Sequence, residues 1–253
     1  MPTQAAPLVP RPCHLTRLAA DFASLAAEAP VRRPHTMSRK QSRCSYCGSE
    51  TRLTRDHVIP QNLFPKPRPA TVITVGACSP CQQLKAKDDQ FLRDYLLMDA
   101  VAGNNPIASD LYDRKVRRSI SRGSSELARH LQAQPFRRVP LVTPAGLYVD
   151  FVIEAPLPQD RVAAILTRVV RGLYYSSRRN LMPASVRSKV LRRSPADFAS
   201  MLDALGPNRR QRVMGAVFGC AFLEDPVPFR TIWLLWFFES VVFTVETEPP
   251  AAV

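Results

Sequence analysis

The chain has 253 residues, of which 45% are hydrophobic, so it is long enough and apolar enough to form a globular protein with one or two domains. Lysine and arginine outnumber aspartate and glutamate by 35 to 21, which gives a formal net charge of +14 at pH 7. Such a surface favours polyanions, such as nucleic acid or an anionic membrane face, but charge indicates the class of partner and not the reaction.

Residues 1–37 are rich in proline, alanine and arginine. Prolines flank a short amphipathic stretch at 16–28 and disfavour a long helix there. We expect a disordered or weakly ordered extension, with Met37 as an alternative start of the chain. No basic stretch followed by an apolar one is present, so we expect no signal peptide and a cytoplasmic protein.

Two cysteine pairs with Cys-x2-Cys spacing come next. Each pair can present two thiolates to one tetrahedral zinc ion, so together they predict a closed four-cysteine structural site. Disulfides are the alternative, but this spacing in a chain of this length without a secretory signal favours metal binding in a reducing compartment. The four cysteines are Cys44, Cys47, Cys78 and Cys81.

Between the two pairs lie Arg55, Asp56 and His57. An adjacent acid and imidazole are what a metal-dependent hydrolase needs, because a carboxylate can hold a divalent ion while an imidazole accepts a proton near neutral pH. Around these residues, 51–59 and 71–77 have the pattern of short extended segments, and a helix is predicted from Gln82 onward. We assign residues 38–92 to this module.

A helical connector is predicted over residues 93–134. Apolar residues recur at helical spacing from 88 to 102, and a Gly-Asn-Asn-Pro sequence then ends that helix. Further helices are expected at 106–119 and 126–131.

Residues 135–253 are predicted to form an α+β domain of unknown role. Strands are expected at 136–141 and 147–153, followed by a helix that Asp160 caps, with the remaining elements in the order strand 186–191, helix 195–205 and strands 213–222 and 232–245. The apolar stretch at 231–245 is too short to span a membrane and contains Glu239, so it suits two buried strands joined tightly near Glu239 and Ser240.

The helix after Asp160 also carries a row of arginines, with no acidic residue between 161 and 193. The row is either a face that contacts nucleic-acid phosphates or an ordinary solvated helix face. Its members are Arg161, Arg168, Arg171 and Arg178.

The sequence CSYCGSETRLTRDHVIPQNLFPKPRP, followed by ITVGACSPCQQLKAKDD, resembles the HNH endonuclease family in its zinc-stapled form. The resemblance is strongest over residues 44–91, and it implies a ββα-metal fold in which a hairpin and a helix hold one divalent ion against the scissile phosphate. On the family pattern, His57 is the general base and Asp56 a ligand of the ion, Mg²⁺ or alternatively Mn²⁺.

Position 82 departs from that pattern. The residue after the fourth cysteine is usually an asparagine that binds the catalytic ion, whereas this chain has Gln82, whose amide oxygen lies one carbon further out. Asp88 and Asp89 lie two turns further along the predicted helix, where they either supply a carboxylate to the site or are solvated, and we expect solvated side chains.

The function expected from this resemblance is metal-dependent hydrolysis of phosphodiester bonds in DNA. Arg55 is a candidate phosphate contact, and no membrane partner is expected. The first alternative is a zinc-stapled nucleic-acid-binding protein whose catalysis has decayed. A protein-interaction module is the second.

Overall fold

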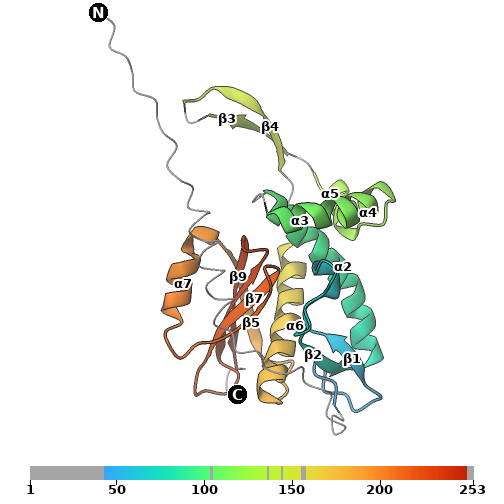
Figure 1. The fold of residues 1–253 in the computed structure, drawn as a ribbon, viewed down its shortest axis with the longest axis vertical. Helices are drawn as coiled ribbons and strands as arrows, with labels where there is room; N and C mark the ends of the chain where they lie inside the picture. The colour runs from blue at the N-terminus through green and yellow to red at the C-terminus, as the bar shows by residue number, and fades with distance from the viewer. Residues whose placement is uncertain (1–42, 103–104, 136, 144, 155–157, 250–253) are drawn as a thin grey trace, which may run out of the picture.

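The computed structural model describes residues 43–102, 105–135, 137–143, 145–154 and 158–249. These residues contain helices and antiparallel sheets, which confirms the predicted α+β class (Figure 1). The predicted N-terminal extension lies outside the described residues. Among the helices that are described, none is both long and apolar enough to cross a bilayer.

A short antiparallel hairpin opens the described part of the chain. Strands β1 (Thr54–His57) and β2 (Thr74–Ala77) pair so that Asp56 lies opposite Val75. The connecting loop contains the 3-10 helix η1 (Gln61–Leu63), and the buried side chains of Leu63 and Phe64 anchor it. Both strands lie within the segments predicted to be extended.

Helix α2 (Ser79–Ala102) follows β2 after a single residue. It begins three residues before the predicted start and continues through the predicted boundary at 92 and 93. Phe91, Leu92 and Leu96 are fully buried on one side of this helix, which explains why it does not end with the cysteine module. The predicted domain boundaries remain a prediction.

The predicted connector helix at 106–119 is present as three contiguous pieces. These are α3 (Pro106–Leu111), the π-helical turn η2 (Tyr112–Val116) and α4 (Arg117–Ser121). Asn105 caps α3 because its side chain accepts a hydrogen bond from the Ala108 amide, and Pro106 fits the first helical position. Helix α5 (Glu126–Gln132) is capped in the same way by Ser125.

A second hairpin, β3 (Arg137–Val142) with β4 (Tyr148–Glu154), stands away from the rest of the molecule (Figure 1). It carries several exposed apolar side chains, among them Leu147, Tyr148 and Val149. A two-stranded hairpin alone is at best marginally stable in water, so this hairpin contributes little to the core.

The C-terminal part is an antiparallel five-stranded sheet in the order β5-β9-β8-β7-β6. Helix α6 (Gln159–Arg178) packs on the side of the sheet that faces the first hairpin, and α7 (Phe198–Ala204), preceded by the turn η3 (Pro195–Asp197), packs on the other (Figure 1). The strands are β5 (Arg187–Arg193), β6 (Arg210–Met214), β7 (Phe218–Glu224), β8 (Thr231–Phe237) and β9 (Val241–Glu248).

Two predicted strands of this sheet had different outcomes. The single strand predicted at 213–222 is wrong, because Gly215, with a φ of 58°, turns the chain and separates β6 from β7. The tight connection predicted near Glu239 and Ser240 is confirmed. Phe238 and Glu239 adopt positive φ values of 50° and 56°, which let β8 return directly as β9.

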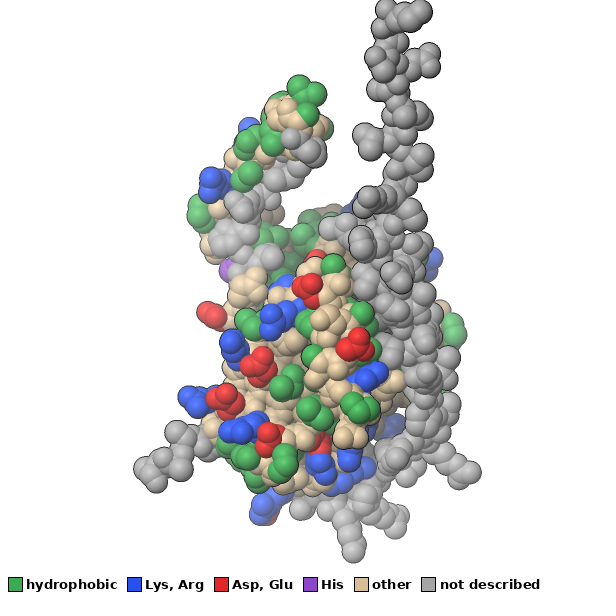
Figure 2. Space-filling model, turned by 90° about the vertical axis from the view of Figure 1, so that its left-hand side faces the viewer, with side chains coloured by type: hydrophobic (Ala, Val, Ile, Leu, Met, Phe, Trp, Pro, Cys, Tyr) green, Lys and Arg blue, Asp and Glu red, His purple; other side chains and the backbone are tan. Residues whose placement is uncertain are grey.

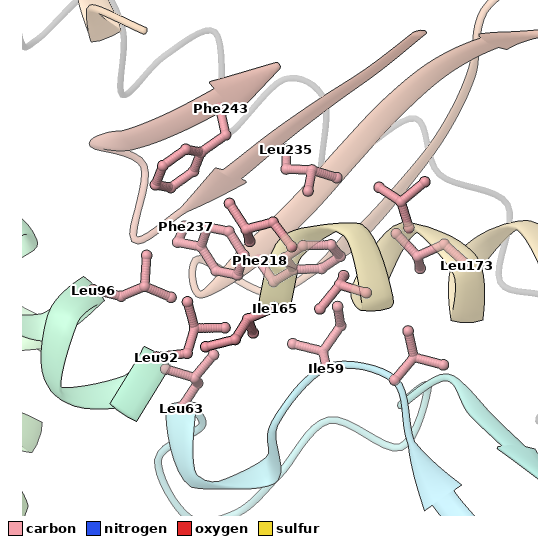
Figure 3. Close-up of a cluster of buried hydrophobic side chains, with 14 of the residues drawn as sticks. Ile59, Leu63, Leu92, Leu96, Ile165, Leu173, Phe218, Leu235, Phe237 and Phe243 are labelled. Atoms are coloured by element: carbon pink, nitrogen blue, oxygen red, sulfur yellow. The ribbon is translucent and has the colours of Figure 1, made fainter. Parts of the chain in front are cut away.

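The main core is continuous from the first hairpin to the five-stranded sheet. Figure 3 shows side chains from the hairpin loop, α2, α6 and the sheet converging on one apolar interior, represented by Ile59, Leu92, Ile165 and Phe237. A second, smaller cluster lies under α7. The cysteine module and the sheet therefore share buried surface.

Helix α6 lies against the module at Gly172. A Cβ atom placed there would lie 2.8 Å from Cγ1 of Val58 and 3.3 Å from Cε1 of Tyr46. A side chain at this position would force Val58 to shift, so the residue just after β1 and the first cysteine turn both lie against α6.

Candidate functional site

The four predicted zinc ligands come together. Their sulfur atoms all lie within 4.8 Å of one another, although they come from the turn before β1, the end of β2 and the first turn of α2. Cys44 and Cys78 are buried, Cys81 is half-buried and Cys47 is exposed. Four thiols in a compact group fit a tetrahedral structural metal such as zinc, so the predicted four-cysteine metal site is confirmed as a geometry.

Hydrogen bonds around the cluster favour the thiolates that a metal requires. The hydroxyl of Ser49 lies 3.1 Å from the sulfur of Cys47, and this contact lowers the pKa of Cys47 to about 6. The backbone N–H of Cys78 donates to the sulfur of Cys44 at 3.4 Å. Burial acts in the opposite direction and raises the pKa of Cys81. A bound cation would offset that cost, because zinc ligands are deprotonated on binding.

Asp56 is held by a residue of the first cysteine turn. The hydroxyl of Tyr46, between Cys44 and Cys47, donates to Oδ2 of Asp56 at 2.7 Å. Burial, together with the negative charge of Asp56, raises the pKa of Tyr46 well above its usual value, so this tyrosine remains a donor at neutral pH. Sequence reasoning missed Tyr46 because nothing in the Cys-Ser-Tyr-Cys motif indicates which way its side chain points.

His57 is the last residue of β1 and is half-buried. Its burial lowers the pKa of the imidazole, which keeps the ring neutral at pH 7. The ring atom Nε2 lies 2.6 Å from the side-chain amide of Gln61. The atom of Gln61 in this contact is its amide nitrogen, which can only donate, so the neutral ring accepts the hydrogen bond at Nε2 and carries its proton on Nδ1.

Gln82 ties the start of α2 to β1. Its amide oxygen accepts a hydrogen bond from the Thr54 hydroxyl at 2.8 Å, and its amide nitrogen donates to the carbonyl of Arg55 at 3.2 Å. The amide oxygen retains a second lone pair, so it can still contribute to an ion site beside β1. Its predicted role as an ion ligand remains a prediction.

A buried ion pair lies further along the same face of α2. Lys85, only 4% exposed, places its ammonium 2.7 and 2.8 Å from the two oxygens of Asp89. Burial nevertheless raises the pKa of Asp89 to about 6, and the charge of Asp56 acts in the same direction.

The expectation of solvated carboxylates on α2 is wrong for Asp88. This residue is 7% exposed, and it accepts from Arg168 at 2.6 Å and from Arg161 at 3.3 Å. These contacts join α2 to α6, so Asp88 contributes to packing between the helices.

The four arginines of α6 are engaged with other parts of the protein. Arg161 also pairs with Glu126 at 2.6 Å and lies over the ring of Phe91, while Arg171 donates to two carbonyls after α6. Arg178 pairs with Glu224. Their acidic partners come from α2, α5 and β7, which is why the acid-free sequence around α6 suggested an unpaired row. A phosphate would have to compete with these contacts.

No family model, curated protein or solved structure matches the chain. The case for a function therefore rests on the residues of the site. These are a four-cysteine cluster, an acid and an imidazole at the end of a strand, and a helix that begins at the fourth cysteine.

Proposed function

We propose that this protein is a metal-dependent endonuclease of the HNH type that hydrolyses phosphodiester bonds, with DNA as its substrate. The observation that supports this best is the link between the cysteine cluster and the acid. Tyr46, inside the first Cys-x2-Cys turn, donates a 2.7 Å hydrogen bond to Asp56, next to the half-buried imidazole of His57. The cluster thus serves as a scaffold for the adjacent acid and base.

The carboxylate of Asp56 is a hard oxygen ligand suited to Mg²⁺ or Mn²⁺, and Gln82 is the candidate second ligand. A divalent ion bound there would neutralise negative charge on the leaving 3′ oxygen of the phosphodiester. Tyr46 holds the Asp56 side chain in place. His57, neutral because burial lowers its pKa, accepts a proton from the attacking water, and Arg55 contacts the phosphate. The products would carry a 5′-phosphate and a 3′-hydroxyl.

The second candidate function is nucleic-acid binding without catalysis. It is favoured by the two hydrogen bonds of Gln82, which engage its amide with Thr54 and Arg55 instead of leaving it free toward an ion. In that case the zinc-stapled module would bind the phosphodiester backbone, and the acid and imidazole would have no catalytic role.

Plasmid cleavage by the zinc-loaded protein, with and without Mg²⁺ or Mn²⁺, separates the two. Replacing His57 by alanine should reduce the cleavage rate by about 10² to 10⁴, the usual contribution of a general base, while bound zinc and melting temperature stay unchanged. His130→Ala is the matched control, because His130 lies on α5, outside the site. Equal cleavage by His57→Ala would refute the proposal, and binding without cleavage by the unmodified protein would support the second candidate.

A further inference from the structure

Positively charged residues lie on the loop that follows His57 and contact it. Gln61 contacts His57, and the next residue, Asn62, accepts a hydrogen bond at its carbonyl from the ammonium of Lys115 at 2.7 Å. Lys115 belongs to η2 in the helical connector, more than fifty residues further along the chain. The connector therefore places a cation against the residue that follows Gln61, the contact of His57.

Two more cations lie on the same loop. Lys66 and Arg68 are both exposed and alternate with Pro65, Pro67 and Pro69. The proline rings restrict the backbone, and the buried side chain of Phe64 fixes the start of the segment. The loop is therefore anchored at the end that follows His57, and its two exposed cations come two and four residues after the buried Phe64.

These cations differ from the arginines of α6 in their partners. Within the described residues, Arg55, Lys66 and Arg68 form no ion pair, and Lys115 contacts a carbonyl, whereas Arg161, Arg168 and Arg178 are each paired with an acid. On the α7 side of the molecule, basic and acidic side chains are interspersed (Figure 2). Cations that form no ion pair in the described residues therefore lie on β1, on the loop that follows His57 and on the connector residue that contacts this loop.

Electrostatic effects agree with this arrangement. Burial is the main cause that lowers the pKa of Lys115, and the charges of Arg93, Arg68 and Lys66 add to this effect. The two exposed cations of the loop therefore lie within electrostatic reach of η2.

We propose that Arg55, Lys66, Arg68 and Lys115 form the surface that holds a nucleic-acid phosphate backbone and leads it to His57, a role that the α6 arginines do not have. The inference rests on the proposed function, since it assigns the substrate path of that same site. Several unpaired cations on fixed elements suit successive phosphates, whose binding releases counterions and makes affinity strongly salt-dependent. The recognised chemistry is the phosphodiester backbone itself.

The test measures binding of labelled duplex DNA, single-stranded DNA and RNA to the full zinc-loaded chain without added Mg²⁺, by fluorescence anisotropy over a range of salt concentrations. Lys66→Gln/Arg68→Gln changes two exposed residues and should preserve the fold, which bound zinc and melting temperature verify. Its control, Lys189→Gln/Arg210→Gln, removes the same charge from exposed positions on the two edge strands of the sheet. Single variants Arg55→Gln and Lys115→Gln complete the set.

We expect the loop variant to lower the salt slope of log K by about two, at roughly 0.9 per lost phosphate contact on duplex DNA, with little change in the control. An equal loss of salt slope in the loop variant and the control would refute the proposed surface. So would the absence of binding of the unmodified chain to all three probes. Binding that depends on these cations but is never followed by cleavage would leave the surface intact and reject the nuclease. Cleavage that is unaffected in the loop variant would reject the surface and leave the proposed nuclease activity intact. The three probes establish which nucleic acid is held.

Discussion

Tyr46 connects the structural and chemical parts of the site through one hydroxyl. A zinc-binding turn normally contributes only stability, whereas here the turn also supplies the donor that fixes Asp56. Hydrogen bonds to charged groups contribute about 1.5 to 3 kcal/mol, enough to determine which rotamer a carboxylate adopts. The position of the proposed ion ligand therefore depends on the cysteine cluster.

Tyr46→Phe removes this hydroxyl and keeps the buried ring. We expect the cleavage rate at subsaturating Mg²⁺ to fall by about tenfold to a hundredfold, which corresponds to about 1.5 to 3 kcal/mol. The concentration of Mg²⁺ that gives half the maximal rate should rise, and bound zinc should not change. Tyr175→Phe on α6 serves as the control. An unaltered Mg²⁺ dependence would show that Asp56 does not need the tyrosine.

Asp89 should make stability depend on pH. Burial raises the pKa of its carboxyl to about 6 from 3.8, so the folded state favours the neutral form. The stability that this provides is complete below about pH 4 and is lost as pH rises through 6. At 1.36 kcal/mol per pKa unit, the loss is about 3 kcal/mol.

Denaturant unfolding of the original chain and of Asp89→Asn, at several pH values from 4 to 7, isolates this effect. The variant cannot titrate at this position, so its free energy of unfolding should rise relative to that of the original chain by about 3 kcal/mol over this range. Proton competition at the cysteines affects both proteins and cancels in the difference. A difference that is constant with pH would contradict the raised pKa.

Local sequence was enough to predict the centre of the site but not its surroundings. The cysteine spacing and the adjacent Asp56 and His57 are short-range signals, and the sulfur atoms do come together. Tyr46 and Lys115 could not be assigned, because their partners are ten and fifty-three residues away and depend on how the elements pack. The acids that engage the α6 arginines were missed for the same reason.

The elements followed their periodicity where side chains face one core, and departed from it where single residues set the backbone. Strands β8 and β9 were predicted with their turn because the apolar run is broken only near Glu239. The strand predicted at 213–222 failed at Gly215, whose positive φ no hydrophobic pattern reports. Helix α2 begins three residues before its predicted start, because the helix includes Cys81 itself.

Three separate elements meet at the cysteine cluster, so metal loss should release all of them. We expect Cys44→Ser to abolish stoichiometric zinc and to unfold the β1–β2 hairpin, because zinc binding in small modules provides about 10 to 16 kcal/mol, comparable to the whole stability of a domain. Zinc per chain and thermal unfolding by circular dichroism provide the readout. Cys220→Ala, a buried cysteine of β7 outside the cluster, is the matched control. Normal zinc content and melting in Cys44→Ser would reject the metal assignment.

Considered as a whole, the molecule is a continuous body with one projecting hairpin. We predict that replacing residues 137–154 by a short Gly/Ser linker shifts the melting temperature by no more than about 2 to 4 °C, the effect of about 1 kcal/mol in a chain of this size. The reason is that β3 and β4 pair with each other and project from the core (Figure 1). A much larger drop would mean that the hairpin packs against the body in solution.

The close approach at Gly172 has a consequence for how this chain can be divided or reused. Val58 and Tyr46 rest directly on α6, and the apolar interior runs without a break from the first hairpin to the five-stranded sheet. A fragment ending near residue 92 would expose that interior to water, so the module cannot be transplanted as an independent cassette. Any transfer of its chemistry to another scaffold would have to bring α6 along, with a residue lacking a side chain at the point of contact.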